Sequence, residues 1–150
     1  VQERQQHLAR GHMQARRPAE DALHSLWVLG VRRMPEGFML VYGWGPEEDG
    51  RLSSLLHIAE TAAAMDMKTS VFLFTDAAIL AKKGTVAKIG DEIDARFRSI
   101  LRSGYVKFYI CEEAARKRGV NNDNIEENLT IIGYATFLDM ASEAKTIITI

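Results

Sequence analysis

The sequence predicts an α/β protein: a three-layer α/β/α sandwich, flavodoxin-like in outline, with a parallel sheet of about five strands. Two observations lead to this prediction. From residue 37 onward, short apolar runs alternate with segments of helical periodicity, which is typical of βαβ units. These runs are apolar throughout, as expected for strands that are covered on both faces. The chain has 150 residues, of which 47% are hydrophobic, and this is enough to form one hydrophobic core.

Each element follows from a local pattern, taken in chain order. Apolar runs predict strands at 38–44, 70–75, 105–110, 129–132 and 145–150. Leucines and alanines at helical spacing predict a helix over 49–66, followed after the second strand by a short helical segment at 77–81 and a loop through Gly84. Further helices are predicted over 91–102, 112–118 and 135–143, the first two ended by Gly104 and Gly119.

Residues 1–36 are predicted to be an N-terminal extension, separate from an α/β domain over residues 37–150. Residues 1–33 hold six arginines against three acids, and the Gln- and Arg-rich stretch over 1–17 has too few apolar residues to bury a face. Apolar residues at helical spacing over 18–34, including Trp27, predict an amphipathic helix that ends at Pro35.

Composition and charge exclude several classes of partner. A formal net charge of -1 and a pI near 6.5 give no field that would attract nucleic acid or anionic lipid. The sequence has no apolar run of the roughly 18 residues that a membrane span needs. A single cysteine, Cys111, cannot form an internal disulfide, so we expect a reducing, cytoplasmic compartment.

No cofactor or metal is predicted either. The four histidines have no metal-ligand spacing. The loop over 43–50 occupies the position of a dinucleotide-binding loop, yet it lacks the G-x-G-x-x-G pattern and carries three acids that would repel a pyrophosphate.

The candidate site residues follow from the predicted sheet, because ligands of open parallel sheets bind outside the carboxyl ends of the strands. The residues at those ends are Trp44 and Gly45, Asp76, Cys111, and Gly133 with Tyr134. The alternative role of Asp76 is that of a helix N-cap. The alternative role of Trp44 is to pack at an interface between subunits.

Cys111 is the candidate nucleophile among these residues. A cysteine that opens a helix faces free backbone N–H groups and the positive end of the helix dipole, which favour the thiolate. Glu112 and Glu113 oppose this effect, and the alternative is a cysteine that packs as a small hydrophobic residue. Because the chain has no second cysteine, any sulfur chemistry at Cys111 must occur between molecules and requires the thiol to be reachable.

The segment over 106–120, an apolar strand that runs into Cys-Glu-Glu-Ala-Ala and then Arg-Gly-Val, resembles the active-cysteine segment of the DsrE/DsrF-like sulfur-relay proteins. Residues 39–44, 71–76 and 133–138 are similar to the same family in order and spacing, so the resemblance covers about residues 37–150. It implies a DsrE-like parallel α/β/α fold, homo- or hetero-oligomers that are often trimers or hexamers, and a cysteine that carries sulfur as a persulfide. The match places Cys111 at that sulfur-carrying position.

The resemblance therefore implies a sulfur carrier or sulfurtransferase that relays sulfane sulfur from a donor protein to an acceptor protein through Cys111. Whether such protein-to-protein transfer makes the chain an enzyme stays open at this point. The alternative is a non-catalytic oligomeric binding or scaffold protein of the same fold, with an inert Cys111. Nucleotide or flavin binding is a third possibility, and the acidic loop over 43–50 argues against it.

Overall fold

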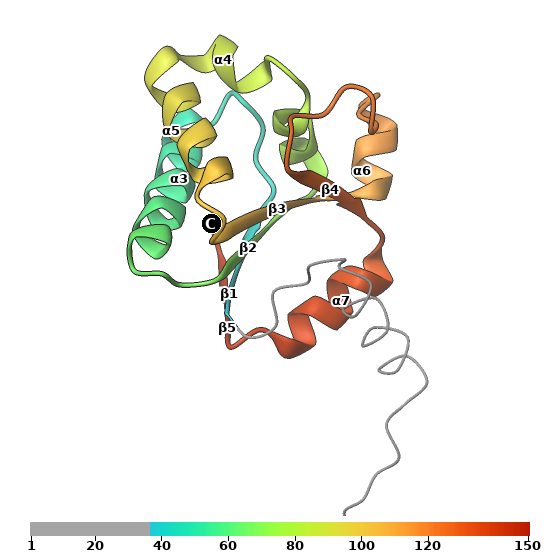
Figure 1. The fold of residues 1–150 in the computed structure, drawn as a ribbon. Coiled ribbons are helices and arrows are strands. Elements are labelled where there is room, and N and C mark those ends of the chain that lie inside the picture. Colours follow the sequence, from blue (N-terminus) through green and yellow to red (C-terminus); the bar gives the residue numbers. More distant parts are fainter. Residues whose placement is uncertain (1–36) are drawn as a thin grey trace, which may run out of the picture. The chain divides into compact units, whose positions relative to one another are not determined.

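The computed structural model describes residues 37–150 (Figure 1). The predicted N-terminal tail and the predicted helix over 18–34 lie outside the described residues. Within residues 37–150, no helix is long and apolar enough to cross a membrane.

A five-stranded, entirely parallel sheet forms the centre of the fold, as the sequence predicts. Its strands are β1 (Phe38–Tyr42), β2 (Thr69–Leu73), β3 (Val106–Cys111), β4 (Leu129–Ile132) and β5 (Thr146–Thr149). Their spatial order is β4-β3-β2-β1-β5. Written from the other edge, this order is 5-1-2-3-4, whereas flavodoxin has the order 2-1-3-4-5. The edge position beside β1 is therefore filled by the last strand here and by the second strand in flavodoxin.

The helices follow the predicted positions with small changes at their ends. They are α3 (Asp49–Ala64), the 3₁₀ helix η1 (Thr75–Ala81), α4 (Thr85–Ile89), α5 (Asp91–Arg102), α6 (Glu112–Lys117) and α7 (Tyr134–Glu143). Helix α4 corrects the prediction of a loop after Gly84. Five residues between two glycines are too few to show helical periodicity in sequence, and Gly84, with φ of 80°, supplies the left-handed turn that begins this helix.

Helices cover both faces of the sheet (Figure 1): α3 and α5 lie on one side and α7 lies on the other. Phe108 of β3 meets Phe97 of α5 edge to face, with ring centroids 5.3 Å apart. On the opposite face, Phe72 of β2 stacks on Phe137 of α7 at 4.2 Å. These aromatic pairs fix which side chains of each strand point to which helix layer, because successive residues of a strand alternate between the two faces.

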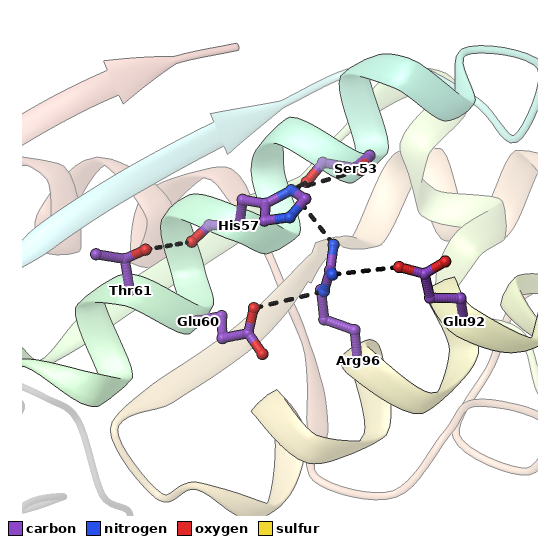
Figure 2. A network of polar contacts seen from close by, with 6 residues as sticks. All are labelled: Ser53, His57, Glu60, Thr61, Glu92 and Arg96. Carbon is purple, nitrogen blue, oxygen red and sulfur yellow. Dashed lines mark hydrogen bonds and ion pairs between the residues drawn. The ribbon is translucent and has the colours of Figure 1, made fainter.

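Polar contacts also join α3 to α5 on the outer side of their layer. The Arg96 side chain reaches from α5 to α3 between His57 and Glu60 (Figure 2). Its guanidinium lies 3.4 Å from a Glu60 carboxylate oxygen, 3.5 Å from one of Glu92 and 3.3 Å from His57 Nδ1. This network joins α3 to α5 on the same side of the sheet.

Candidate functional site

The candidate site lies at the carboxyl ends of β3 and β4, which are neighbours in the sheet. Crossovers between parallel strands are right-handed, so the connection from β3 to β4 runs on the side of α3 and α5. The connection from β4 to β5 runs back to the far edge on the other side, through α7 (Figure 1). Chains that leave neighbouring strands toward opposite faces open a crevice between them, which is where ligands of such sheets bind.

Cys111 is the last residue of β3 and directly precedes α6. The sequence predicts a strand that ends at residue 110, so the strand is one residue longer at this end than predicted. It pairs in register with Ile132 of β4. Its side chain points to the face that α7 covers, because it lies two residues beyond Tyr109, the register partner of Phe72. The residue is buried, with 2% of its surface exposed.

The helix dipole contributes less to this cysteine than the sequence suggests. Helix α6 has six residues, fewer than two turns, so few peptide dipoles are aligned behind Cys111. Glu112 and Glu113 occupy its first turn. The chemical surroundings of the thiol are therefore set by side chains from neighbouring elements.

Tyr134 is the side chain from α7 that meets Cys111. It is the first residue of α7, and its hydroxyl donates a hydrogen bond of 3.1 Å to Glu113 Oε2. A hydrogen bond with the Cys111 side chain, the bond to Glu113 and the nearby charges raise the pKa of Tyr134 to about 12. Its phenol therefore keeps its proton at physiological pH and is available as a hydrogen-bond donor.

Glu113 is held from two sides. Its Oε1 lies 2.9 Å from Lys117 Nζ, one helical turn further along α6, while its Oε2 accepts the Tyr134 hydrogen bond. The hydrogen bond to Lys117, followed by the one from Tyr134, lowers the pKa of Glu113, which therefore stays ionised. The sequence alone indicates Glu113 as a charge that opposes the thiolate. The spacing of four residues between Glu113 and Lys117 could have indicated their pairing.

Gly133, the other candidate after β4, is the N-cap residue directly before α7, with φ of -82°. A β-carbon built on it would lie 3.4 Å from Glu112 Oε2, which is an ordinary contact distance. Gly133 therefore brings the start of α7 close to the start of α6 without backbone strain.

Asp76 lies in the first turn of η1, after β2, and the N-cap position of that helix is occupied by Phe74. Its carboxylate accepts a hydrogen bond of 2.5 Å from Arg118, the C-cap residue directly after α6. The alternative role as a helix cap is thus not the one the structure shows. Asp76 reaches the site indirectly, by fixing the far end of the helix that follows Cys111.

Trp44 and Gly45 follow β1, which is separated from β3 by β2. The guanidinium of Arg51, in α3, lies 4.0 Å from the centre of the Trp44 ring. The carbonyl of Gly45 accepts the backbone N–H of Glu48 at 3.2 Å. The structure therefore connects these two residues to the start of α3, whereas Gly133 and Tyr134 meet the segment around Cys111.

Thr75 is a residue at the strand ends that sequence reasoning missed. Its φ of 49° is rare for a β-branched residue and marks a strained turn directly after β2. Its hydroxyl donates a hydrogen bond of 2.7 Å to the Gly43 carbonyl, which ties the ends of β1 and β2 together. A β-carbon on Gly43 would lie 3.0 Å from Thr75 Oγ1, so this junction favours glycine. No local sequence signal identifies this pair.

In residues 37–150, no three side chains of histidine, cysteine, aspartate or glutamate come together in a way that could hold a metal ion.

The fold and the sequence together define the family. The sequence model of the DsrE/DsrF-like family matches residues 37–150, which include every element described above. The chain belongs to the DsrE/DsrF-like family. Membership points to sulfur relay at the level of the family.

Solved structures support the same fold. The chain is similar to the ychN protein of E. coli, with a TM-score of 0.62 and 17% identity over 77% of this chain and 99% of that one. It is also similar to MTH1491, a protein of unknown function from Methanobacterium thermoautotrophicum, with a TM-score of 0.55 and 14% identity over 73% and 98% of the two chains. At these identities the likeness establishes the fold alone.

One curated relative matches more closely in sequence. The uncharacterized protein MJ0760 of Methanocaldococcus jannaschii is 39% identical over 94 residues, which is 57% of this chain. The match covers 32% of that protein, so the chain spans about a third of its length.

Proposed function

We propose that the protein is a sulfur carrier in which Cys111 accepts a sulfane sulfur from a donor persulfide and passes it to an acceptor thiol. The observation that supports this most directly is the position of Cys111: the only thiol of the chain lies at the carboxyl end of β3, beside the end of β4 and directly before α6. The family's association with sulfur relay supports the same function.

The chemistry is an exchange at sulfur that leaves the oxidation level of the transferred atom unchanged. The Cys111 thiolate attacks the outer sulfur of a donor R–S–SH, the donor S–S bond breaks, and R–S⁻ leaves. The product is Cys111–S–SH. In the second step an acceptor thiolate attacks the outer sulfur of this persulfide and releases the Cys111 thiolate, so no oxidant or reductant is consumed.

Intact-mass measurement after exposure to inorganic polysulfide tests this function. We expect a gain of about 32 Da, the mass of one sulfur atom, on the wild-type chain and none on Cys111→Ser. A matched control places a thiol elsewhere: Ser142 is exposed on α7, so the double variant Cys111→Ser, Ser142→Cys measures loading of an ordinary surface cysteine. Wild-type loading no greater than that of this control would reject the proposal.

A second candidate function is favoured by the burial of Cys111. With 2% of its surface exposed, the thiol packs within the core cluster, as an inert cysteine in an oligomeric binding or scaffold protein would. Labelling with a small thiol reagent distinguishes the two. If Cys111 in the native protein reacts with the reagent only as fast as the protein unfolds, and no sulfur is loaded onto Cys111, the binding function is supported. The sulfur-carrier function is then rejected.

The proposal also includes assembly into a homo-oligomer, which the family resemblance implies. Leu138 on α7 and Ile147 on β5 support it, since both are large apolar side chains that are exposed in the single chain. Sedimentation velocity checks this part, and a monomer at micromolar concentration would contradict it.

A further inference from the structure

The chain that leads into α7 passes over the carboxyl end of β3, where Cys111 lies. It leaves β4 at Ile132, and Phe137, in the first turns of α7, stacks on Phe72 of β2. Strand β3 lies between β4 and β2, so the residues between Ile132 and Phe137 cross β3. They cross it on the face to which the Cys111 side chain points, because α7 covers that face. The start of α7 therefore contributes to the burial of Cys111, which is 2% exposed.

A hydrogen bond joins the start of α7 to the start of α6. Cys111 and Ile132 are partners in the register of β3 and β4, so the two chains leave the sheet side by side. Two residues beyond this pair on each chain, the Tyr134 hydroxyl donates to Glu113 Oε2 over 3.1 Å. Tyr134 is 56% exposed, so the bond lies near the surface while Cys111 is buried. It connects the two chains directly after the position of the thiol.

Further contacts hold this bond in place. Glu113 Oε1 lies 2.9 Å from Lys117 Nζ, one turn further along α6, which leaves Oε2 to accept the bond from Tyr134. Glu113 stays ionised, and hydrogen bonds to ionised groups are stronger than neutral ones. Glu112 also lies close to the other chain, since a β-carbon on Gly133 would be 3.4 Å from its Oε2. Side chains of α6 thus hold the starts of the two helices together.

This closed arrangement restricts the proposed reaction. A donor persulfide must bring its outer sulfur to the Cys111 sulfur, but only 2% of that residue is exposed. Helix α6 has six residues and α7 has ten, and within residues 37–150 neither helix has a side-chain capping hydrogen bond at its start. Such helix ends open at a lower free-energy cost than the strands of a core. Separation of the two helix starts therefore exposes the thiol without unfolding the sheet.

We propose that the hydrogen bond between Tyr134 and Glu113 is a latch that closes the site, and that Cys111 accepts sulfur only while this latch is open. The latch controls access to the thiol and takes no part in the chemical steps. As a regulation of sulfur loading, the inference rests on the proposed function. The closed form protects the thiol from small oxidants, and a donor protein that binds the open form more tightly shifts the protein toward that form.

Alkylation of native Cys111 by iodoacetamide measures how often the latch opens, because the reagent must reach the sulfur. The full chain is labelled at one pH as wild type, Tyr134→Phe, Glu113→Ala and the double variant. Tyr134→Phe removes the donor of the bond and Glu113→Ala removes the acceptor, so we expect each variant to react about fivefold faster than wild type. The double variant should react no faster than the faster single variant, since both substitutions break the same bond.

Glu112→Ala is the matched control for charge. Glu112 precedes Glu113 in the first turn of α6 and has the same charge, whereas the printed bond of Tyr134 goes to Glu113. Its substitution should speed alkylation less than Glu113→Ala does, and Tyr134→Phe changes no charge at all. Low concentrations of urea provide a second control. Opening of the latch exposes little surface, so the faster rates of the latch variants should not change with urea below the unfolding transition.

Four results would each overturn the inference. They are a Tyr134→Phe rate equal to wild type, equal effects of Glu112→Ala and Glu113→Ala, multiplied effects of Tyr134→Phe and Glu113→Ala in the double variant, and faster rates that rise steeply with urea. The last of these would mean that the variants expose Cys111 by unfolding of the whole domain.

Failure of the inference and failure of the proposed function give different results. Each variant is also exposed to inorganic polysulfide, and its intact mass is measured over time. If the variants and wild type are alkylated at one rate and gain about 32 Da at one rate, the sulfur-carrier function stands and the latch is rejected. If the latch variants are alkylated faster but none of the proteins gains sulfur, the latch stands as a control of access to Cys111 and the sulfur-carrier function is rejected.

Discussion

Phe72 of β2 and Phe137 of α7 stack with their ring centroids 4.2 Å apart and their planes inclined by 23°. This pair fixes α7 on the sheet, and α7 begins at Tyr134, one turn before Phe137. The packing of an aromatic pair is thereby coupled to the position of the hydroxyl that meets Cys111. A change at Phe137 should reach the thiol without touching it.

We expect Phe137→Ala to lower the free energy of unfolding by about 2 to 3 kcal/mol, because it removes a half-buried ring from the core. It should also speed labelling of Cys111, since α7 then packs less firmly on the face of the sheet to which the thiol points. Thr136→Ala is the control on the same helix, as Thr136 is exposed, and it should change neither quantity noticeably. Denaturant titration and alkylation kinetics measure both effects, and equal effects of the two variants would contradict the coupling.

The ion pair between Asp76 and Arg118 should contribute little to stability. The side chains are 67% and 26% exposed, so solvent screens much of their attraction. A double-mutant cycle with Asp76→Ala and Arg118→Ala is expected to give a coupling energy of about 0.2 to 1 kcal/mol, smaller at high salt. A coupling energy well above this range would mean that the pair is more strongly desolvated than its exposure indicates.

Tyr42 should make unfolding depend on alkaline pH. It is fully buried, and its hydroxyl has no hydrogen-bond partner within residues 37–150. Burial, and then the nearby charge of Glu48, raise the pKa of Tyr42 to about 12, above its usual value of 10.0. Between these values the unfolded chain loses the proton while the folded chain keeps it. The stability that this group contributes is therefore complete below pH 10 and is lost as pH rises toward 12, a loss on the order of 2 kcal/mol.

Tyr42→Phe provides the comparison. At pH 7 the variant should be at least as stable as wild type, by up to about 1 kcal/mol, because an unpaired buried hydroxyl is replaced by hydrogen. Its stability should fall less between pH 10 and 12. Tyr134 also titrates there but is present in both proteins, so its effect cancels. Chemical denaturation at each pH measures the free energy of unfolding of both proteins. If this free energy falls equally in both between pH 10 and 12, the assignment to Tyr42 is refuted.

Arg96 should contribute more to stability than a single surface ion pair, because it contacts three groups on two helices (Figure 2). Its side chain is 20% exposed. We expect Arg96→Ala to lower the free energy of unfolding by about 1 kcal/mol, partly through lost packing of its aliphatic stem, with the difference reduced in salt. Arg102→Ala, an exposed position in the last turn of the same helix, is the control and should have a smaller effect.

Local sequence patterns were enough to predict most of the elements. Strand β4 and helix α5 begin and end at the predicted residues, because an apolar run and a strong amphipathic period are both visible in a short window. Helix α4 could not be found this way, since five residues hold little more than one turn. The positive φ of Thr75 has no local signal either, because the hydrogen bond to Gly43, 32 residues earlier, maintains it.

The sequence by itself determined that Cys111, Asp76 and Tyr134 lie at the ends of parallel strands or directly after them, because strand positions depend on local hydrophobic patterns. Only the tertiary structure decided which of them meet. Tyr134 reaches Glu113 across 21 residues and Asp76 reaches Arg118 across 42, and both contacts depend on strand order and on the side that each connection takes. The same packing buries the Cys111 thiol, since the burial of a side chain depends on neighbours that the local sequence does not contain.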